Sequence, residues 1–251
     1  PPPPPPPPTS RRDRAKAWLR DPPWWVRDIV VVLLVSVLVL LATAEIDDRR
    51  AETDRTIAAR ANAQAERLEN LRFVRERSDW SNPDPKTVRP FGGLDLEQQH
   101  LVGLVMTRSD LRSANLRDAN LTGTNLAASF VNDADFTGAD LVRADLTGVD
   151  AGGGEEIRGL RASGADLTDA TVYGANLLAT DFRGATLTRA DLRSTSLDGS
   201  DLSGAKLTGA RLAYTTLGGA NLEHADLTGV CWNSFTVWPK GFSPPPEKSC
   251  D

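Results

Sequence analysis

The sequence predicts an all-β solenoid that is preceded by a transmembrane helix and a charged helical stalk. Three observations lead to this fold class. A large apolar residue recurs every five residues over more than half of the 251-residue chain. An unbroken run of 16 uncharged, mostly aliphatic residues covers 29–44. Residues 45–78 are good helix formers and contain neither Gly nor Pro. The average of 40% hydrophobic residues therefore combines three unlike segments.

The first segment, residues 1–23, is predicted to be a disordered Pro-rich and basic tail. Residues 1–8 are all proline, which favours an extended polyproline II rod. Such a run can be a ligand for a proline-binding domain or simply a stiff tail, and we favour the tail. A basic stretch follows, made of Arg11, Arg12, Arg14, Lys16 and Arg20.

Residues 24–44 are predicted to form a transmembrane helix. The 16-residue run alone would be roughly 24 Å long, whereas a bilayer core needs about 30 Å. Trp24 and Trp25 at the interface, with Arg27 extended toward headgroups, bring the segment into spanning range. A cleaved signal peptide is the alternative, because Ala42-Thr43-Ala44 fits the small-residue cleavage pattern. We prefer the anchor, since the run exceeds the usual apolar region of a signal peptide.

The Lys and Arg residues beside the apolar run predict its orientation. Six lie in residues 9–28 and four in residues 45–64, which favours a cytoplasmic N-terminus. The repeat region would then lie outside the cytoplasm, in a single-pass protein of the cell membrane. A disulfide between Cys231 and Cys250 is allowed in that compartment, although the sequence does not require it.

Residues 45–79 are predicted to form a charged helical stalk. Its apolar positions recur at helical spacing and include Ile57, Leu68 and Leu71. The stalk could dimerise as a coiled coil or dock one face on its own domain. We favour docking, because Gln64 weakens a coiled-coil seam. Residues 80–93, with two prolines in Asn82-Pro83-Asp84-Pro85, are predicted to be a linker.

Residues 94–237 carry the five-residue repeat. Each large apolar residue is preceded two positions earlier by a small residue and one position earlier by a polar one, and Gly often follows two positions later. A period of five fits neither a helix nor a flat strand, so the backbone must turn a corner every five residues. A large and a small inward residue per repeat fill a narrow core, and ladder hydrogen bonds stack the coils.

Two details of the repeat can be predicted further. The interval from Leu146 to Ile157 is two repeats plus one residue, so we expect one inserted residue near Gly152–Gly154. The ends need covers, because open ladders recruit other chains. Leu71, Phe73 and Val74 are candidates at the start. Residues 238–251 are predicted to be a cap and tail, with a plug made of Trp232, Val237, Trp238, Pro239 and Phe242.

The repeat resembles the pentapeptide-repeat family. The matching motifs are ANLRD at 114–118, ADFTG at 134–138 and ADLTG at 144–148 and 225–229. The resemblance implies a right-handed quadrilateral β-helix with four repeats per coil. The flanks ENLRFVRERSD at 69–79 and WPKGFSPP at 238–245 are similar to those of actinobacterial members with an N-terminal membrane helix.

The sequence predicts no catalytic, cofactor-binding or metal-binding residue, and it assigns no binding residue. One outward column holds Asp181, Asp201 and Asn221, which could attract cations or a basic partner; a solvated acidic face is the favoured interpretation. His224 has no second His or Cys nearby, so a metal site there is not expected. No phosphate-binding loop or nucleophile elbow occurs. We therefore expect a protein that is not an enzyme and needs no cofactor.

The function predicted is that of a membrane-anchored, non-catalytic scaffold for protein interactions. The membrane would be bound through residues 24–44; the protein partner is not identified and a homodimer is left open. The net charge of −5 argues against direct nucleic-acid binding. The family resemblance implies one alternative, an acidic mimic of DNA that binds gyrase or another DNA-binding protein. A secreted repeat protein, released by signal-peptide cleavage, is the other.

Overall fold

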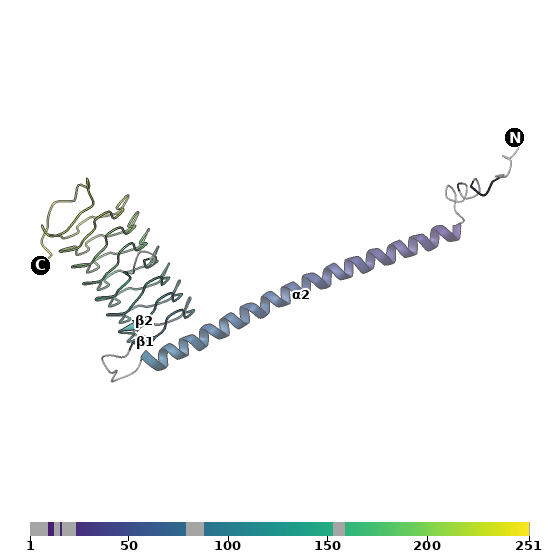
Figure 1. Cartoon of the computed structure of the whole chain (residues 1–251), viewed down its shortest axis with the longest axis horizontal. Coiled ribbons are helices and arrows are strands. Elements are labelled where there is room, and N and C mark those ends of the chain that lie inside the picture. The colour runs from purple at the N-terminus through teal and green to yellow at the C-terminus, as the bar shows by residue number, and fades with distance from the viewer. Residues whose placement is uncertain (1–9, 13–15, 17–23, 79–87, 153–158, 251) are drawn as a thin grey trace. The chain divides into compact units, whose positions relative to one another are not determined.

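The computed structural model describes residues 10–12, 16, 24–78, 88–152 and 159–250 (Figure 1). Its regular elements are helix α2 (Trp24–Ser78) and the short strands β1 (Arg89–Pro90) and β2 (Ser109–Asp110). The chain divides into two compact parts, Pro1–Asn62 and Ala63–Asp251. The polyproline rod predicted for residues 1–8 lies outside the described residues, as do the side chains of Trp24, Trp25 and Arg27.

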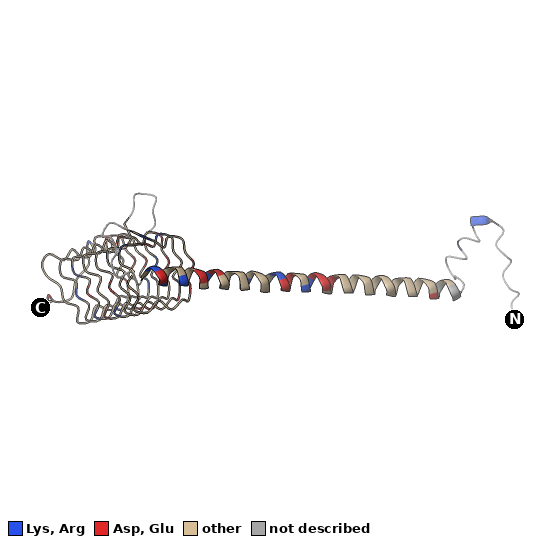
Figure 2. Cartoon of the chain, turned by 90° about the horizontal axis from the view of Figure 1, so that it is seen from below, with Lys and Arg blue, Asp and Glu red and all other residues tan. Residues whose placement is uncertain are grey.

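Helix α2 contains both the predicted transmembrane segment and the predicted stalk. It contains an 18-residue window with a mean hydropathy of 2.9, and none of that window is buried. Within the apolar run, the Ser36 hydroxyl donates to the Val32 carbonyl at 2.8 Å and the Thr43 hydroxyl donates to Leu40 at 2.9 Å. The helix therefore satisfies its own polar groups there, as a bilayer interior demands. Figure 2 shows this uncharged run and the charged residues that follow it along the helix.

From Arg89 onward the chain winds into stacked coils (Figure 1). β1 pairs in parallel with β2, so that Arg89 lies opposite Ser109, 20 residues later. The same spacing continues as single parallel bridges, for example from Asn120 to Asp140, and one bridge occurs every five residues. Because the chain turns after each bridge, each face of a coil contains too few paired residues to form a long strand. A solenoid with four repeats per coil is the result.

In a repeat that carries Asp or Asn before the large residue, every backbone N–H can find an acceptor. In Ala119–Gly123, the N–H groups of Asn120, Leu121 and Gly123 donate to neighbouring coils at 2.9, 2.7 and 2.9 Å. The Ala119 N–H closes the preceding turn at 3.2 Å. The Thr122 N–H donates to the side-chain Oδ1 of Asn120 at 3.0 Å. Where Asp or Asn precedes the large residue, its side chain thus completes the turn, which explains why that position is often Asp or Asn.

The corner residue of the repeat has a positive φ. Gly123 has a φ of 65°, and glycine is frequent at this position because it lacks the Cβ that opposes the left-handed region. Other residues also adopt the conformation, including Ala128 with a φ of 58°. The glycines that are frequent two residues after the large apolar residue are therefore explained by the positive φ of this corner.

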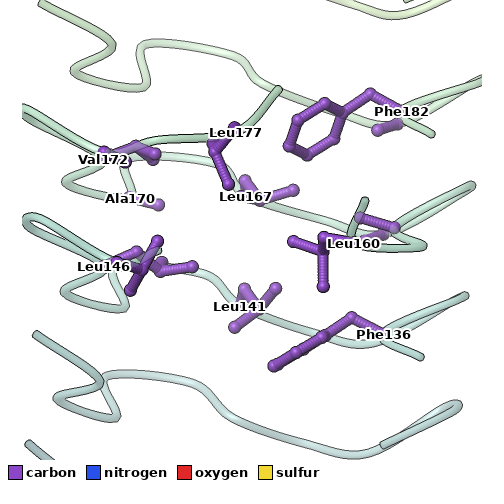
Figure 3. Packing of buried hydrophobic residues seen from close by; sticks show 14 of the residues in the cluster. Phe136, Leu141, Leu146, Leu160, Leu167, Ala170, Val172, Leu177 and Phe182 are labelled. Carbon is purple, nitrogen blue, oxygen red and sulfur yellow. The ribbon is translucent and has the colours of Figure 1, made fainter. Parts of the chain in front are cut away.

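The core consists of the large and small inward residues of successive coils. Figure 3 shows Leu141 beside Leu167 and Leu146 beside Val172, one coil apart. At some small positions a buried hydroxyl replaces Ala: Thr195 donates to the Val172 carbonyl of the preceding coil at 2.7 Å. The core is therefore narrow and close-packed, and the buried hydroxyl of Thr180 is the one at these small positions that has no hydrogen-bond partner among the described residues.

The prediction of one inserted residue after Leu146 is wrong, because six are inserted. Phe130 pairs with Asp150, 20 residues later, but Asp135 pairs with Arg161, 26 residues later. Ile157, predicted as a core residue, lies outside the described residues. Before the insertion, Ala151 stands where most repeats have a large inward residue. After it, Leu160 stands where most repeats have a small one, and both side chains are buried. Figure 3 shows Leu160 between Phe136 and Phe182 of the neighbouring coils.

At its start the solenoid is covered by the end of α2, from Ala63 to Ser78. Val74 is fully buried in the core, and the Phe73 ring meets Phe91 edge to face at 6.0 Å between centroids. The predicted cover is confirmed, and Leu71 also packs there. The predicted linker 80–93 is too long, because Arg89–Phe91 already form the first coil.

At the other end, Trp232, Trp238 and Phe242 pack on the last coils as predicted. The Trp232 and Trp238 rings meet edge to face at 5.5 Å between centroids. The prediction for Val237 is wrong: its side chain is outward and the residue is 49% exposed. Val237 lies opposite Thr216, 21 residues earlier, so one extra residue precedes it and moves it to a bridge position.

Candidate interaction surface

The predicted acidic column exists on one outer face. Asp181 pairs with Asp201 and Asp201 with Asn221 in successive coils, and the next face carries Asp166, Thr186, Lys206 and Asp226 in the same order. The column extends toward the first coil through Arg161 and Asp135. Arginines therefore occur in and beside it.

These arginines form ion pairs with carboxylates of the column, namely Asp135 and Asp181. Arg183 lies beside Asp181, with Nη2 2.7 Å from Oδ2, and the pair is partly exposed. The hydrogen bond from Arg183 keeps the pKa of Asp181 below its usual range. The other oxygen of Asp181 accepts the backbone N–H of Arg183 at 3.1 Å. The Asp181 carboxylate thus stabilises its own turn and binds the guanidinium of Arg183. A further cation would have to displace this guanidinium.

The residues considered for metal chemistry do not come together. His224 is exposed, and its Nε2 lies 3.4 Å from Oε1 of Glu223. In residues 24–78, 88–152 and 159–250, no three His, Cys, Asp or Glu side chains form a group that could hold a metal ion. The outer faces instead carry many polar side chains that accept backbone N–H groups of their own turns, as Asp181 does.

An exposed aromatic pair near the C-terminal end breaks this pattern. The Tyr214 and Phe235 rings are stacked, 5.2 Å between centroids with 12° between their planes. They are 55% and 66% exposed, so they add little to the core. We call this pair the aromatic corner.

Both members of the aromatic corner depart from the repeat. Tyr214 has a φ of 64° at the position where Gly is frequent, which is an unfavourable conformation for a bulky residue. Phe235 lies within the stretch lengthened by one residue. Asn233 holds the two together, because its Oδ1 accepts the backbone N–H groups of Tyr214 at 3.1 Å and Phe235 at 3.2 Å. The platform is therefore fixed before any ligand arrives.

Beside the aromatic corner lies a groove of about 250 Å³. Its walls come from four parts of the chain and include Arg193, Tyr214, Trp232, Asn233, Glu247 and Cys250. We call it the C-terminal groove. The guanidinium of Arg193 is already paired with Asp191, Nη2 to Oδ2 at 2.6 Å. The groove therefore offers mixed polar groups without a strong net charge.

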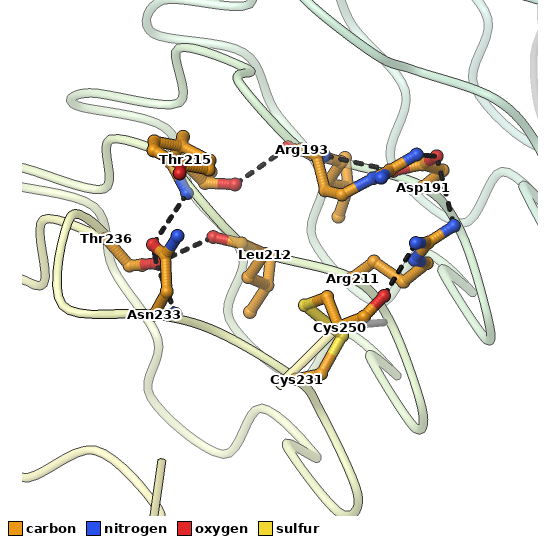
Figure 4. Close-up of a disulfide and its surroundings, with 11 residues drawn as sticks. Asp191, Arg193, Arg211, Leu212, Thr215, Cys231, Asn233, Thr236 and Cys250 are labelled. Carbon is orange, nitrogen blue, oxygen red and sulfur yellow. Dashed lines mark hydrogen bonds and ion pairs between the residues drawn. A yellow bond between two sulfur atoms is a disulfide. The ribbon is translucent and has the colours of Figure 1, made fainter. Parts of the chain in front are cut away.

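A disulfide fixes the tail that forms one wall of the groove. Cys231 and Cys250 are bonded, with 4.9 Å between their Cα atoms (Figure 4). Arg211 donates from Nη2 to the Cys250 carbonyl at 2.6 Å, and the Trp232 N–H donates to the Lys248 carbonyl at 2.9 Å. The pairing that the sequence left open is thus present. The aromatic corner was missed in the sequence, although Tyr214 at a frequent glycine position was a visible signal.

Comparison with known proteins identifies the repeat. The family model for pentapeptide repeats matches in 8 copies, over residues 91–127, 114–150, 165–204 and 205–231. These ranges cover about half of the chain and coincide with the stacked coils. No curated protein matches the sequence.

Solved structures of pentapeptide repeat proteins are similar to parts of the chain. One from the thylakoid lumen of Arabidopsis thaliana is 31% identical over 38% of this chain, with a TM-score of 0.27, and the match spans 56% of its own length. HetL, a protein involved in heterocyst differentiation regulation from the cyanobacterium Nostoc, is 26% identical over 62% of this chain and 88% of its own, with a TM-score of 0.26. The plasmid-mediated fluoroquinolone resistance protein QnrB1 is 17% identical, covering 59% of this chain and 81% of that one, with a TM-score of 0.27.

Proposed function

Since the chain belongs to the pentapeptide-repeat family, we propose that it is a membrane-anchored, non-catalytic scaffold whose solenoid presents binding surfaces outside the cytoplasm. One observation carries this proposal. Helix α2 holds an apolar window with a mean hydropathy of 2.9 that no other part of the described chain covers. Leu38 is 64% exposed and Leu40 is 67% exposed. A bilayer is the surrounding that removes this surface from water.

The anchor is favoured over a cleaved signal peptide by the course of the helix. Ala42, Thr43 and Ala44 lie within α2, which continues without interruption to Ser78. A protease that cleaves an extended segment would have to unwind it there. A membrane helix that leads directly into the stalk needs no such step.

Two observations favour an external solenoid. Six Lys and Arg residues precede the apolar run in residues 9–28, against four in residues 45–64 after it. The Cys231–Cys250 disulfide is of the kind that persists in oxidising compartments and is rare in the cytosol. Both support an N-terminus in the cytoplasm.

The gyrase-binding DNA mimic receives less support. Residues 107–236 contain 11 Lys and Arg against 17 Asp and Glu, a net charge of −6. The arginines, however, neutralise the acidic faces locally, as Arg189 does with Asp169 at 2.7 Å. A surface of alternating pairs is a weak imitation of the continuous negative charge of duplex DNA.

Membrane extraction tests the anchor. The full chain is expected in the carbonate-resistant membrane fraction at its full mass. Leu34→Arg with Leu38→Arg should release it, because a charge at the helix centre costs about 2.5–3.5 kcal/mol. Leu68→Arg is the matched control, since Leu68 is 61% exposed but lies beyond the apolar run. A soluble product that begins just after Ala44 would replace the anchor with a secreted protein.

A further inference from the structure

We propose that the aromatic corner and the C-terminal groove form a binding site for a linear, uncharged glycan chain. The proposal deepens the proposed function by naming a partner class, and it rests on that function only for access to extracellular glycans. It starts from two departures from the repeat, the Tyr at a corner position and the extra residue before Val237. Together they bring Tyr214 and Phe235 into one exposed stack. Neither departure adds to the core, so a recognition role explains both.

The flat rings suit the C–H face of a pyranose. Tyr and Phe rings present a broad, rigid apolar face, and a sugar ring carries its C–H bonds on one side and its hydroxyls around the edge. Asn233 accepts both backbone N–H groups of the pair, so little ordering remains to be done on binding. The hydroxyls at the sugar edge then need polar partners close by.

The groove provides such partners. Asn233 and Glu247 line the groove, and within the described residues the Asn233 amide nitrogen donates to no acceptor and Glu247 forms no ion pair. Donor and acceptor groups of this kind match hydroxyls, which both donate and accept. A phosphate-rich or nucleic-acid ligand fits less well, because Arg193 is neutralised by Asp191 and Glu247 would repel it. A cationic ligand would in turn meet the guanidinium of Arg193.

The edge of the solenoid beside the aromatic corner is long enough for more than one sugar. Tyr173, Arg193 and Ala213 occupy the same position in three successive coils, and Tyr214 follows Ala213. At about 4.8 Å per coil, Tyr173 and Tyr214 are roughly 10 Å apart along the axis. The guanidinium carbon of Arg193 lies 5.8 Å from the centre of the Tyr173 ring. Tyr173 is 46% exposed, so a chain laid along the corner would meet an aromatic ring near each end.

The test is titration of the purified full chain, in detergent micelles, with two soluble probes: the β-1,4-linked hexamers of glucose and of N-acetylglucosamine. Binding is read from calorimetry and from the change in tryptophan fluorescence, to which Trp232 in the groove contributes. At least one probe is expected to bind. Tyr214→Gly should weaken binding by about tenfold or more, because it removes one ring of the stack.

Tyr214→Gly is informative because it keeps the fold. Glycine is the residue best suited to the φ of 64° at this corner, so a loss of binding cannot be attributed to unfolding. Ser194→Gly is the matched control, one coil away with a φ of 59°, and should bind normally. Phe235→Ala should repeat the loss seen with Tyr214→Gly.

The proposal is overturned if neither hexamer binds, or if Tyr214→Gly binds as the parent chain does. It is also overturned if the pair instead mediates self-association, which sedimentation would detect as dimers that Tyr214→Gly dissolves. These measurements use purified protein and do not depend on its location. A failure here therefore leaves the membrane anchor standing, and a soluble chain would leave the glycan site standing.

Discussion

Arg67 of α2 is paired with Asp95 of the first coil, with 2.7 Å between Nε and Oδ2. Its Nη2 also lies 2.6 Å from Oε2 of Glu97, and the arginine side chain is only 25% exposed. One guanidinium thus joins the end of the helix to two carboxylates of the solenoid. Together with buried Val74, this contact closes the first coil, whose ladder would otherwise be open.

Arg67→Gln is expected to loosen this cover. Losing a partly buried, charge-assisted pair and exposing two acidic groups to each other should cost about 1–3 kcal/mol locally. Hydrogen exchange should accelerate in residues 89–101 and at the end of α2. Arg72→Gln is the control, because Arg72 pairs with Glu76 on the exposed face of the helix. Equal exchange in the two variants would contradict the role given to Arg67.

Leu160→Ala should destabilise the coil that carries the insertion. Leu160 is 3% exposed and belongs to the hydrophobic core, so truncation to Ala would leave a cavity there. The expected cost is about 2–5 kcal/mol, measured by thermal or denaturant unfolding. Leu178→Ala, at a residue 38% exposed, should cost far less. Similar losses from both variants would contradict the core role given to Leu160.

Ala128→Gly should stabilise the solenoid, although glycine usually weakens a fold. Ala128 has a φ of 58°, where the missing Cβ of glycine relieves strain. A gain of roughly 0.5–1 kcal/mol in the free energy of unfolding is expected. Ala127→Gly, one residue earlier and outside the positive-φ positions, should instead destabilise slightly. A loss from Ala128→Gly would mean that the corner is less strained than its dihedral indicates.

The ion pairs of the outer faces predict an acid-sensitive solenoid. Hydrogen bonds from Arg112 and Arg183 hold the pKa values of Asp110 and Asp181 below the unfolded value of about 3.9. A lowered folded pKa stabilises the fold above pH 4, and this stability is lost as the pH falls through the folded pKa. Each exposed pair contributes little, so the effect is a sum over several pairs.

Thermal unfolding between pH 7 and pH 2 measures this dependence. The midpoint should be nearly constant down to about pH 5 and fall below pH 4. The double variant Arg112→Gln with Arg183→Gln should have a lower midpoint at pH 7 and a shallower fall in acid. A variant whose curve is parallel to that of the parent would contradict the assignment.

The repeat itself made most of the solenoid predictable. The five-residue spacing identifies Leu141 and Leu167 as inward residues, and the column of Asp181 and Asp201 follows once the four repeats per coil that the family resemblance implies are added. The length of the insertion could not be obtained in this way. Insertions of one and of six residues shift a period of five by the same amount, so the register alone cannot separate them.

The candidate site was less predictable for a different reason. Tyr214 and Phe235 are 21 positions apart, and only the stacking of coils brings them together. Val237 was misplaced by the same extra residue that exposes Phe235, because a shift of one position turns an inward side chain outward. Local departures from a repeat, such as Tyr214 in place of glycine, are therefore the signals to follow in this fold.

The most direct test of a membrane-anchored external solenoid is a topology reporter fused after Asp251. One fusion carries alkaline phosphatase, which is active outside the cytoplasm, and the other carries a fluorescent protein that matures in the cytoplasm. An anchored solenoid outside the cytoplasm should give phosphatase activity in the membrane fraction and no fluorescence. Fluorescence without phosphatase activity would place the solenoid in the cytoplasm and contradict its proposed external location.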